Sequence, residues 1–199
     1  MYSFEEELFG KGITLIAGVD EAGRGPLAGP VVAAAVILPQ NKRIDGVNDS
    51  KKLSDKKREK LFDEIMSSAQ VGVGIIDERI IDEVNIYQAT RLAMKKAVCA
   101  IPVKPEYLLI DGNMIIDLET SAESIIKGDS KSASIAAASI IAKVTRDRIM
   151  KKLHDEYPQY GFDKHKGYPT KLHVERLCEY GVLPVHRKSY GPVKKVLGL

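Results

Sequence analysis

A series of short apolar segments, several of them followed by a carboxylate, constrains the fold of this chain most. Apolar and β-branched side chains predict five buried strands. They span residues 13–19, 31–38, 71–76, 107–110 and 123–126. Asp20 and Glu21 follow the first segment, Asp111 follows the fourth, and Asp129 follows the fifth after a short interval. Strands of this kind are typical of an α/β protein whose ligand site lies where strand ends converge.

Helical patterns separate the later strands and follow them. Capping residues, apolar spacing and closing prolines or glycines predict four helices. They span residues 54–66, 78–100, 132–154 and 171–180. Three early strands, followed by alternating strands and helices, indicate helical layers on a mixed sheet. We expect a core over residues 1–158 and a helical and loop extension over residues 159–199 that packs on it.

Composition indicates an ordinary soluble protein. Of the 199 residues, 44% are hydrophobic and 29% are charged, close to the globular average. The longest apolar run, residues 31–38, is far shorter than the ~20 residues that a membrane helix needs. The start of the chain is acidic, unlike a secretory signal. Cys99 and Cys178 are too far apart for a CxxC motif, so we expect a reduced, cytoplasmic chain. We also expect a monomer without membrane contact.

The carboxylates that follow the strands are candidates for a metal site. Carboxylate oxygens without a Cys/His cluster select Mg²⁺ or Mn²⁺ over zinc. Two such ions can bind the attacking water and the leaving oxygen of a phosphoryl displacement. Residues 42–60 carry eight Lys/Arg against four acids, and residues 180–199 carry four Lys/Arg and no acid. Basic segments near acidic positions are what a nuclease needs to hold a phosphate backbone.

Each acid also has an ordinary structural explanation. Asp20 and Glu21 are neighbours, so a regular strand would point them to opposite faces. Asp111 with the glycine after it suits a tight turn, and Asp129 suits a helix N-cap. Asp117 and Glu123 are close in sequence to Asp129 and are alternatives to it. The histidines at 165 and 173 lack a second ligand at suitable spacing, so we expect structural roles or peripheral phosphate contacts.

A glycine-rich segment follows Glu21. Gly23, Gly25 and Gly29 do not form a dinucleotide-binding motif, because the spacing is one residue too long and a predicted strand follows. Backbone groups that no side chain covers can instead approach a sugar-phosphate chain closely, with Arg24 adding a guanidinium.

Several motifs together resemble those of bacterial ribonuclease HII, the type 2 ribonuclease H family. The first is DEAGRGPLAGPVVAAAV at residues 20–36, and the most specific later one is SIAAASI at residues 134–140. Others are DSKKLS at 49–54, DG at 111–112, GD at 128–129, GY at 167–168, HR at 186–187 and SY at 189–190. The resemblance runs in order from about residue 13 to residue 191.

The resemblance implies a ribonuclease H-like mixed five-stranded sheet with flanking helices and a small C-terminal helical part. It implies an endoribonuclease that hydrolyses the RNA strand of RNA/DNA hybrids. Such an enzyme also nicks 5′ of ribonucleotides embedded in duplex DNA, leaving 3′-hydroxyl and 5′-phosphate ends. The catalytic residues and ligands of two Mg²⁺ or Mn²⁺ ions would be Asp20, Glu21, Asp111 and Asp129.

The resemblance also implies a substrate-binding set. Gly23, Arg24 and Gly25 would contact the ribose 2′-hydroxyl and its phosphates, and Tyr168 would pack on the next sugar. The 2′-hydroxyl is the one group that separates ribose from deoxyribose, so a close backbone contact can sense it. The basic residues expected to hold the phosphate backbone are Lys51, Lys52, Lys143 and Arg146.

Two other functions are compatible with these patterns. A 3′–5′ exonuclease would have a related carboxylate set, although that class typically shows Asp-x-Glu on its first strand, whereas Asp20 and Glu21 are adjacent. A non-catalytic nucleic-acid-binding module would have lost acids at the four positions, and none is lost here. The tail, residues 193–199, lacks an aromatic pair, so we predict no contact with a sliding clamp.

Overall fold

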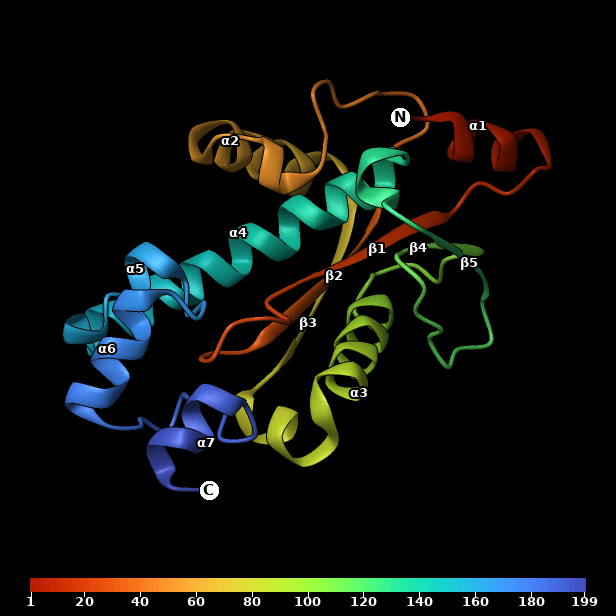
Figure 1. Ribbon diagram of the computed structural model, residues 1–199. Helices are drawn as coiled ribbons and strands as arrows, with labels where there is room; N and C mark the ends of the chain where they lie inside the picture. Colours follow the sequence, from red (N-terminus) through yellow and green to blue (C-terminus); the bar gives the residue numbers. More distant parts are fainter.

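A mixed five-stranded sheet forms the centre of the computed structural model, which describes residues Met1–Leu199 (Figure 1). The strands are β1 (Ile16–Ala22), β2 (Val31–Ile37), β3 (Gln70–Ile76), β4 (Tyr107–Asp111) and β5 (Ser121–Ile125). Their order across the sheet is β3-β2-β1-β4-β5. β1 pairs antiparallel with β2 and parallel with β4, while β2–β3 is antiparallel and β4–β5 parallel. The predicted mixed sheet is therefore confirmed. The expectation that all five strands are buried is wrong for β5, which lies at the edge of the sheet and is exposed from Ser121 to Ser124.

Seven helices surround the sheet. They are α1 (Ser3–Gly10), α2 (Asp55–Ser68), α3 (Glu78–Cys99), α4 (Ala133–Glu156), α5 (Phe162–His165), α6 (Lys171–Tyr180) and α7 (Gly191–Leu197). Three short 3₁₀ turns are η1 (Ser50–Lys52), η2 (Gly128–Ser130) and η3 (Pro158–Tyr160). The four predicted helices correspond to α2, α3, α4 and α6. The structure adds α1, α5 and α7, which the sequence patterns did not indicate. None of the helices is long and apolar enough to cross a membrane.

Helix α4 lies directly on β1 and β2 because both surfaces are made of small residues. Its buried face is rich in alanine, including Ala136, Ala137 and Ala138. Under its first turn, a Cβ on Gly18 of β1 would lie 2.0 Å from the Ser134 backbone carbon. No side chain fits at such a position, so glycine there allows the close approach. This contact brings the first half of α4 alongside the end of β1.

Helix α3 covers the opposite face of the sheet. Gly72 and Gly74 of β3 allow its backbone to approach, since a Cβ on either would lie within about 2.1 Å of an α3 carbonyl oxygen. The helix bends at Asn85, whose φ of 68° is left-handed. The larger buried cluster fills the space between α3 and the sheet, and a second cluster lies under α2 and α4.

The segment after α4 folds back on that helix. Tyr160 and Phe162 stack with a centroid separation of 5.5 Å and pack on Met150 of α4 and on Ala28. Figure 1 shows α5 and α6 beside the C-terminal half of α4, with α7 lying between them and α3. This segment therefore reaches the loop between β1 and β2, which contains the glycine-rich motif.

Candidate active site

Asp20 and Glu21 lie within β1 and not beyond it. The predicted strand ends at residue 19, but pairing with β2 continues through Glu21 to Ala22. The Asp20 side chain is only 5% exposed. Its Oδ1 accepts a 2.6 Å hydrogen bond from the backbone N–H of Glu21, and the Ser139 hydroxyl of α4 lies against it. Helix α4 therefore shapes the environment of Asp20.

Asp111 ends β4, the strand beside β1. Its Oδ1 accepts backbone hydrogen bonds from Gly128 at 2.6 Å and from Asp129 at 3.3 Å. Both donors belong to η2, the turn that leads into α4. The strand-end prediction for Asp111 is thus correct in position, and its carboxylate holds the turn that carries Asp129.

The surroundings of Asp129 bear on which acid belongs with Asp111. Asp129 is half-buried, and its pKa is raised by desolvation and then by the negative charges of Asp111 and Asp49. Asp117, by contrast, has a side chain 89% exposed and forms an ion pair of 3.8 Å with Lys95. Glu123 is exposed on β5. Of the three acids considered from the sequence, the structure brings Asp129 to Asp111.

The four acids repel one another, and burial reduces the screening of their charges by water. Burial raises the pKa of Asp20 well above its usual value, and the charges of Glu21 and Asp111 raise it further. Burial also raises the pKa of Glu21, with Asp111 adding to the shift and Arg24 opposing it. Arg24 lies 3.4 Å from Glu21. No lysine or arginine forms an ion pair with Asp20, Asp111 or Asp129.

This donor set fits a hard divalent cation. The side chains as they lie do not form a ready-made cage, since no three His, Cys, Asp or Glu groups converge closely enough to hold an ion. The buried carboxylate of Asp20 nevertheless accepts hydrogen bonds only from neutral donors, and a buried charge without an ion-pair partner is costly. Carboxylate oxygens are the ligands that Mg²⁺ and Mn²⁺ prefer.

A cleft of about 420 Å³ opens beside these acids. It gathers most of the residues that the sequence assigned to substrate binding. Its lining consists of Glu21, Ala22, Gly23, Arg24, Gly25, Ser50, Lys51, Ser139, Lys143 and Tyr168. Four separate stretches of the chain supply these residues: the end of β1 with its loop, η1, α4 and the turn after α5. Lys52 is exposed on η1 next to Lys51.

The two glycines of the motif have different surroundings. Gly23 has a φ of +98°, and a Cβ there would lie 2.1 Å from Nε of Arg146. Gly25 lies on the cleft, where the nearest atom to its hypothetical Cβ is Cε1 of Tyr168 at 3.5 Å. Gly23 is therefore required by the fold, while Gly25 leaves a bare backbone facing an exposed tyrosine ring.

The expectation that Arg146 binds substrate is not supported by its position. The side chain is 1% exposed, and its guanidinium donates to the carbonyl oxygens of Ala28, Pro30 and Lys166. Burial lowers its pKa to about 10. The residue lies behind the glycine-rich loop, where backbone acceptors use its donors, so it positions the loop and cannot reach a phosphate in the cleft.

Arg187 plays a similar part and was missed as a functional residue. It is fully buried, and its guanidinium donates to the carbonyl oxygens of Gly23, Arg24 and Gly29. The Tyr190 hydroxyl donates to the Arg24 carbonyl as well, at 2.7 Å. The sequence showed this arginine only as part of a basic tail motif, and nothing in that pattern indicates burial against a loop 160 residues away.

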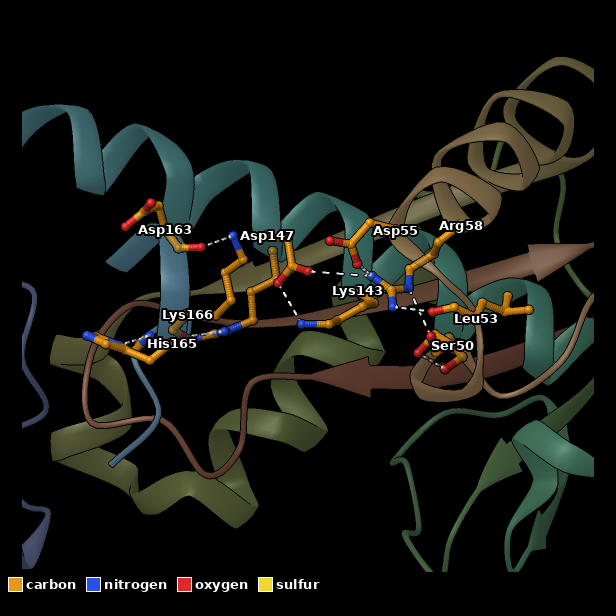
Figure 2. A network of polar contacts seen from close by, with 12 residues as sticks. Ser50, Leu53, Asp55, Arg58, Lys143, Asp147, Asp163, His165 and Lys166 are labelled. Atoms are coloured by element: carbon orange, nitrogen blue, oxygen red, sulfur yellow. Dashed lines mark hydrogen bonds and ion pairs between the residues drawn. The ribbon is translucent and has the colours of Figure 1, made fainter. Parts of the chain in front are cut away.

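Lys143, which lines the cleft, belongs to a polar network that Figure 2 shows. Arg58 of α2 donates to the carbonyl oxygens of Ser50 and Leu53, both at 2.9 Å, and so holds η1. The Ser50 hydroxyl lies 2.9 Å from that of Ser139, which contacts Asp20. Lys143 donates to Asp147 at 2.7 Å.

The negative charges of nearby acids act on the ammonium group of Lys51. Desolvation lowers its pKa, but the charges of Asp49, Asp20 and Asp129 outweigh that effect and raise it. Lys51 is therefore firmly cationic where the carboxylates meet the cleft. Lys51 therefore adds a positive charge to the cleft that the glycine-rich loop also lines.

Solved structures share this architecture. The ribonuclease H2 from Pyrococcus horikoshii OT3 superposes with a TM-score of 0.81 and 30% identity, covering 91% of this chain and 96% of that one. The RNase HII in the PCNA:RNase HII complex from Archaeoglobus fulgidus gives 0.78 and 29%, covering 89% and 95%. The fold, with carboxylates on its central strands beside a basic cleft, defines a ribonuclease H.

Sequence comparison narrows this class. The family model for ribonuclease HII matches residues 17–193. A ribonuclease HII of Bacillus mycoides (strain KBAB4) is 58% identical over 198 residues, which is 99% of this chain and 77% of the relative. The chain belongs to the ribonuclease HII family. It is thus an endonuclease that hydrolyses RNA in RNA/DNA hybrids.

Proposed function

We propose that this enzyme also nicks duplex DNA on the 5′ side of an embedded ribonucleotide, leaving 3′-hydroxyl and 5′-phosphate ends. The observation that carries the proposal is a shared cleft. It contains the carboxylate of Glu21, the bare backbone of Gly25 and the ring of Tyr168. A sensor of one ribose and a set of acids beside it are what cleavage next to a single ribonucleotide requires.

The sugar-recognising part consists of Gly23, Arg24, Gly25 and Tyr168. Arg146 and Arg187 hold the carbonyl groups of the loop from behind, so its shape is set before substrate binds. A Cβ on Gly25 would lie 3.5 Å from Cε1 of Tyr168, so the bare Gly25 backbone and the ring border one edge of the cleft together. A ribose seated there would present its 2′-hydroxyl to the backbone, while a deoxyribose would leave those polar groups without a partner.

The cationic side of the cleft would hold the nucleic acid backbone. Lys51 and Lys52 follow Asp49 on η1, and Lys143 lines the cleft from α4. Arg58 keeps η1 in place by its two backbone hydrogen bonds. Phosphate contacts of this type position a duplex without reading its sequence. The substrates are therefore RNA/DNA hybrid and ribonucleotide-containing duplex DNA.

Asp20, Glu21, Asp111 and Asp129 would hold two divalent ions, Mg²⁺ or Mn²⁺. When bound, such ions supply a nucleophilic water at neutral pH and stabilise the charge on the leaving oxygen. The protein shapes the site in two ways. It buries Asp20 away from water, and the Asp111 carboxylate accepts hydrogen bonds that hold η2 in place. Glu21, which faces both Arg24 and the cleft, would link the ions to the recognised ribose.

The organisation of the chain follows from the same proposal. Residues 1–158 would form the catalytic core, and residues 159–199 an extension that carries Tyr168 and Arg187 to it. Both cysteines are free and exposed, which suits a reducing compartment, so we place the enzyme in the cytoplasm, acting as a monomer.

A cleavage assay on three duplexes tests the proposal. The substrates are DNA with one internal ribonucleotide, the same duplex without it, and an RNA/DNA hybrid, each with Mg²⁺, Mn²⁺ or EDTA. We expect one nick 5′ of the ribonucleotide with either metal, cleavage of the hybrid, and no cutting of all-DNA. Stepwise shortening from a 3′ end would indicate an exonuclease, and binding without cleavage a non-catalytic module.

A matched pair of variants tests the choice of the fourth acid. Asp129→Asn should abolish cleavage while the protein still binds the duplex. Asp117→Asn, which removes an exposed acid nearby in sequence, should cleave like the unchanged enzyme. Loss of cleavage in Asp117→Asn with activity retained in Asp129→Asn would overturn the assignment.

A further inference from the structure

Three histidines lie buried behind the turn that carries Tyr168. His173 and His186 are fully buried, and His165 is 8% exposed. The rings of His165 and His173 stack at 4.4 Å, and Phe162 meets the edge of both. None of the three lines the cleft. Neither the proposed metal site nor the sugar contacts use these groups, so their presence in an aromatic core needs its own explanation.

The hydrogen bonds of His186 and His173 assign one proton position after another. The backbone N–H of Leu183 donates to Nδ1 of His186 at 2.9 Å, so this nitrogen is an acceptor. Nε2 of His186 must then carry the proton of the neutral ring. It lies 3.1 Å from Nε2 of His173, which therefore accepts. That leaves the proton of His173 on Nδ1, 3.0 Å from the carbonyl oxygen of Tyr168.

The chain of contacts thus runs in one direction, from the Leu183 amide through two imidazoles to the Tyr168 carbonyl. It requires both rings to be neutral, because a second proton on either would set donor against donor. The surroundings favour this state. The pKa of both His173 and His186 is lowered to about 4, mainly by desolvation, with smaller contributions from His165 to both rings and from His173 to His186. No acid forms an ion pair with either ring.

His165 holds the other side of the same turn. Its Nδ1 accepts from the backbone N–H of Gly167 at 3.2 Å, so its Nε2 donates to the Tyr160 carbonyl at 2.8 Å. Lys166 and Gly167 have left-handed φ values of +50° and +82°. A non-glycine residue in this region is strained, and such a turn persists only when its surroundings hold it. His165 and His173 supply contacts on each side of that turn.

We propose that His186 and His173 form a proton-ordered relay that positions Tyr168 for recognition of the ribonucleotide. This inference rests on the sugar-binding role proposed for Tyr168. The relay acts through the backbone: it fixes the carbonyl of Tyr168, and with it the direction in which the ring leaves the turn. His173 and His186 are thus positioning residues that touch neither the substrate nor the reacting atoms.

Arg187, the residue after His186, connects the two histidines to the glycine-rich loop. Arg187 holds the carbonyl oxygens of Gly23 and Arg24, and His186 itself forms a β-bridge with Ala28. The Gly167 carbonyl accepts from Leu27 of the same loop at 2.7 Å. Two consecutive residues therefore organise both the loop and the turn against which the ribose would sit. A small rotation of the Tyr168 turn would change the distance between them.

Side-chain amides at position 173 provide a test. In His173→Asn the amide can place a donor where Nδ1 stands, while in His173→Gln the amide is carried toward Nε2 and away from the Tyr168 carbonyl. We expect the Gln variant to lose about tenfold or more in kcat on DNA with one ribonucleotide, since small misplacements at such sites are costly. The Asn variant should retain more of the original kcat than the Gln variant. Equal losses in both would overturn the relay.

A double-mutant cycle separates positioning from general damage. In a Tyr168→Ala background, His173→Gln should cost no more than about twofold further, because the ring it positions is gone. Multiplicative losses would show that His173 acts elsewhere and contradict the proposal. If Tyr168→Ala itself leaves cleavage unchanged, the proposed role of Tyr168 fails. If Tyr168→Ala impairs cleavage and His173→Gln does not, the relay alone fails.

The proton order has a spectroscopic signature that does not depend on activity. Imidazole ¹⁵N chemical shifts at neutral pH should show His173 protonated on Nδ1, and His165 and His186 protonated on Nε2. Finding His173 protonated on Nε2, or cationic, in the unchanged protein would contradict the assignment.

Discussion

The carboxylate of Asp111 accepts a 2.6 Å hydrogen bond from the backbone N–H of Gly128. This contact, together with the 3.3 Å hydrogen bond from the Asp129 amide, joins the end of β4 to the turn that carries Asp129 and so brings the two acids together. A Cβ on Gly128 would lie 3.3 Å from that carboxylate and 2.5 Å from Cδ1 of Ile135. The turn therefore has no room for a larger residue.

Replacing Asp111 by Asn should separate the structural role of this side chain from its chemical role. The amide oxygen can still accept from Gly128, so folding should be unchanged. We expect cleavage to fall by about a thousandfold or more, since a metal ligand contributes several kcal/mol to the transition state. Single-turnover cleavage and duplex binding measure the two effects. Glu123→Gln, an exposed change on β5, is the control, and comparable activity in both variants would refute the ligand role.

The raised pKa of Asp20 predicts that the site destabilises the metal-free protein. Its pKa in the folded state lies above the ordinary value of 3.8, so between those two values the folded protein binds more protons than the unfolded chain. Stability attributable to Asp20 is therefore lost as the pH rises through this window and stays lost at pH 7.

Asp20→Asn should accordingly raise the melting temperature in EDTA at pH 7, by about 2–4 °C for each kcal/mol relieved. The gain should vanish below the ordinary carboxyl pKa, where Asp20 is neutral in both states. Adding Mn²⁺ should stabilise the unchanged protein more than the variant. Thermal melts recorded against pH, with and without metal, measure these effects. A lower melting temperature for Asp20→Asn at neutral pH in EDTA would contradict the prediction.

The two glycines of the motif should respond differently to alanine. Gly23→Ala places a Cβ against the buried guanidinium of Arg146 at a positive φ, so it should lower stability together with activity. In Gly25→Ala the new Cβ would lie 3.5 Å from Cε1 of Tyr168, an ordinary van der Waals contact, so the variant should fold normally. Its methyl group would nevertheless occupy the place proposed for ribose. Melting curves and cleavage at a single ribonucleotide distinguish the pair, and full activity in Gly25→Ala would argue against sugar recognition there.

Glu5 of α1 should contribute to the stability of the catalytic face. It is 3% exposed and accepts from the Ser132 hydroxyl and from the amide and hydroxyl of Ser134, at the start of α4. A carboxylate there satisfies free N–H groups and suits the positive end of the helix. Glu5→Gln should cost about 1–3 kcal/mol in urea unfolding. Glu7→Gln, an exposed change on the same helix, should have little effect on the free energy of unfolding. Equal losses of stability in the two variants would show that Glu5 does not stabilise the start of α4.

The sequence predicted the elements whose signals are local. Buried strands and long capped helices follow from periodicity, and Ser54 caps α2 as its pattern indicates, accepting from the Lys57 N–H. Helix α1 escaped prediction because eight residues make a marginal helix on their own. Glu5 fastens it to serines more than 120 residues away. The register of β1 past Asp20 likewise depends on pairing with β2, which no local pattern encodes.

The residues of the candidate site also fall into two groups, those that local sequence signals indicate and those that depend on contacts distant in sequence. The acids and the glycines were recognisable because their positions at strand ends and turns carry a chemical meaning. Arg146 was assigned to substrate binding from the resemblance to ribonuclease HII. Its burial is decided by backbone acceptors of a loop more than 100 residues earlier. Arg187 and the histidines acquire their roles only when the C-terminal segment packs against that loop.

Anomalous diffraction from crystals grown with Mn²⁺ would show whether Asp20 and Asp111 share a divalent cation. We expect a manganese peak with oxygens of both carboxylates in its coordination shell, beside Gly25 and Tyr168. A peak held by other residues, or none near these two acids at a Mn²⁺ concentration that supports cleavage, would contradict it.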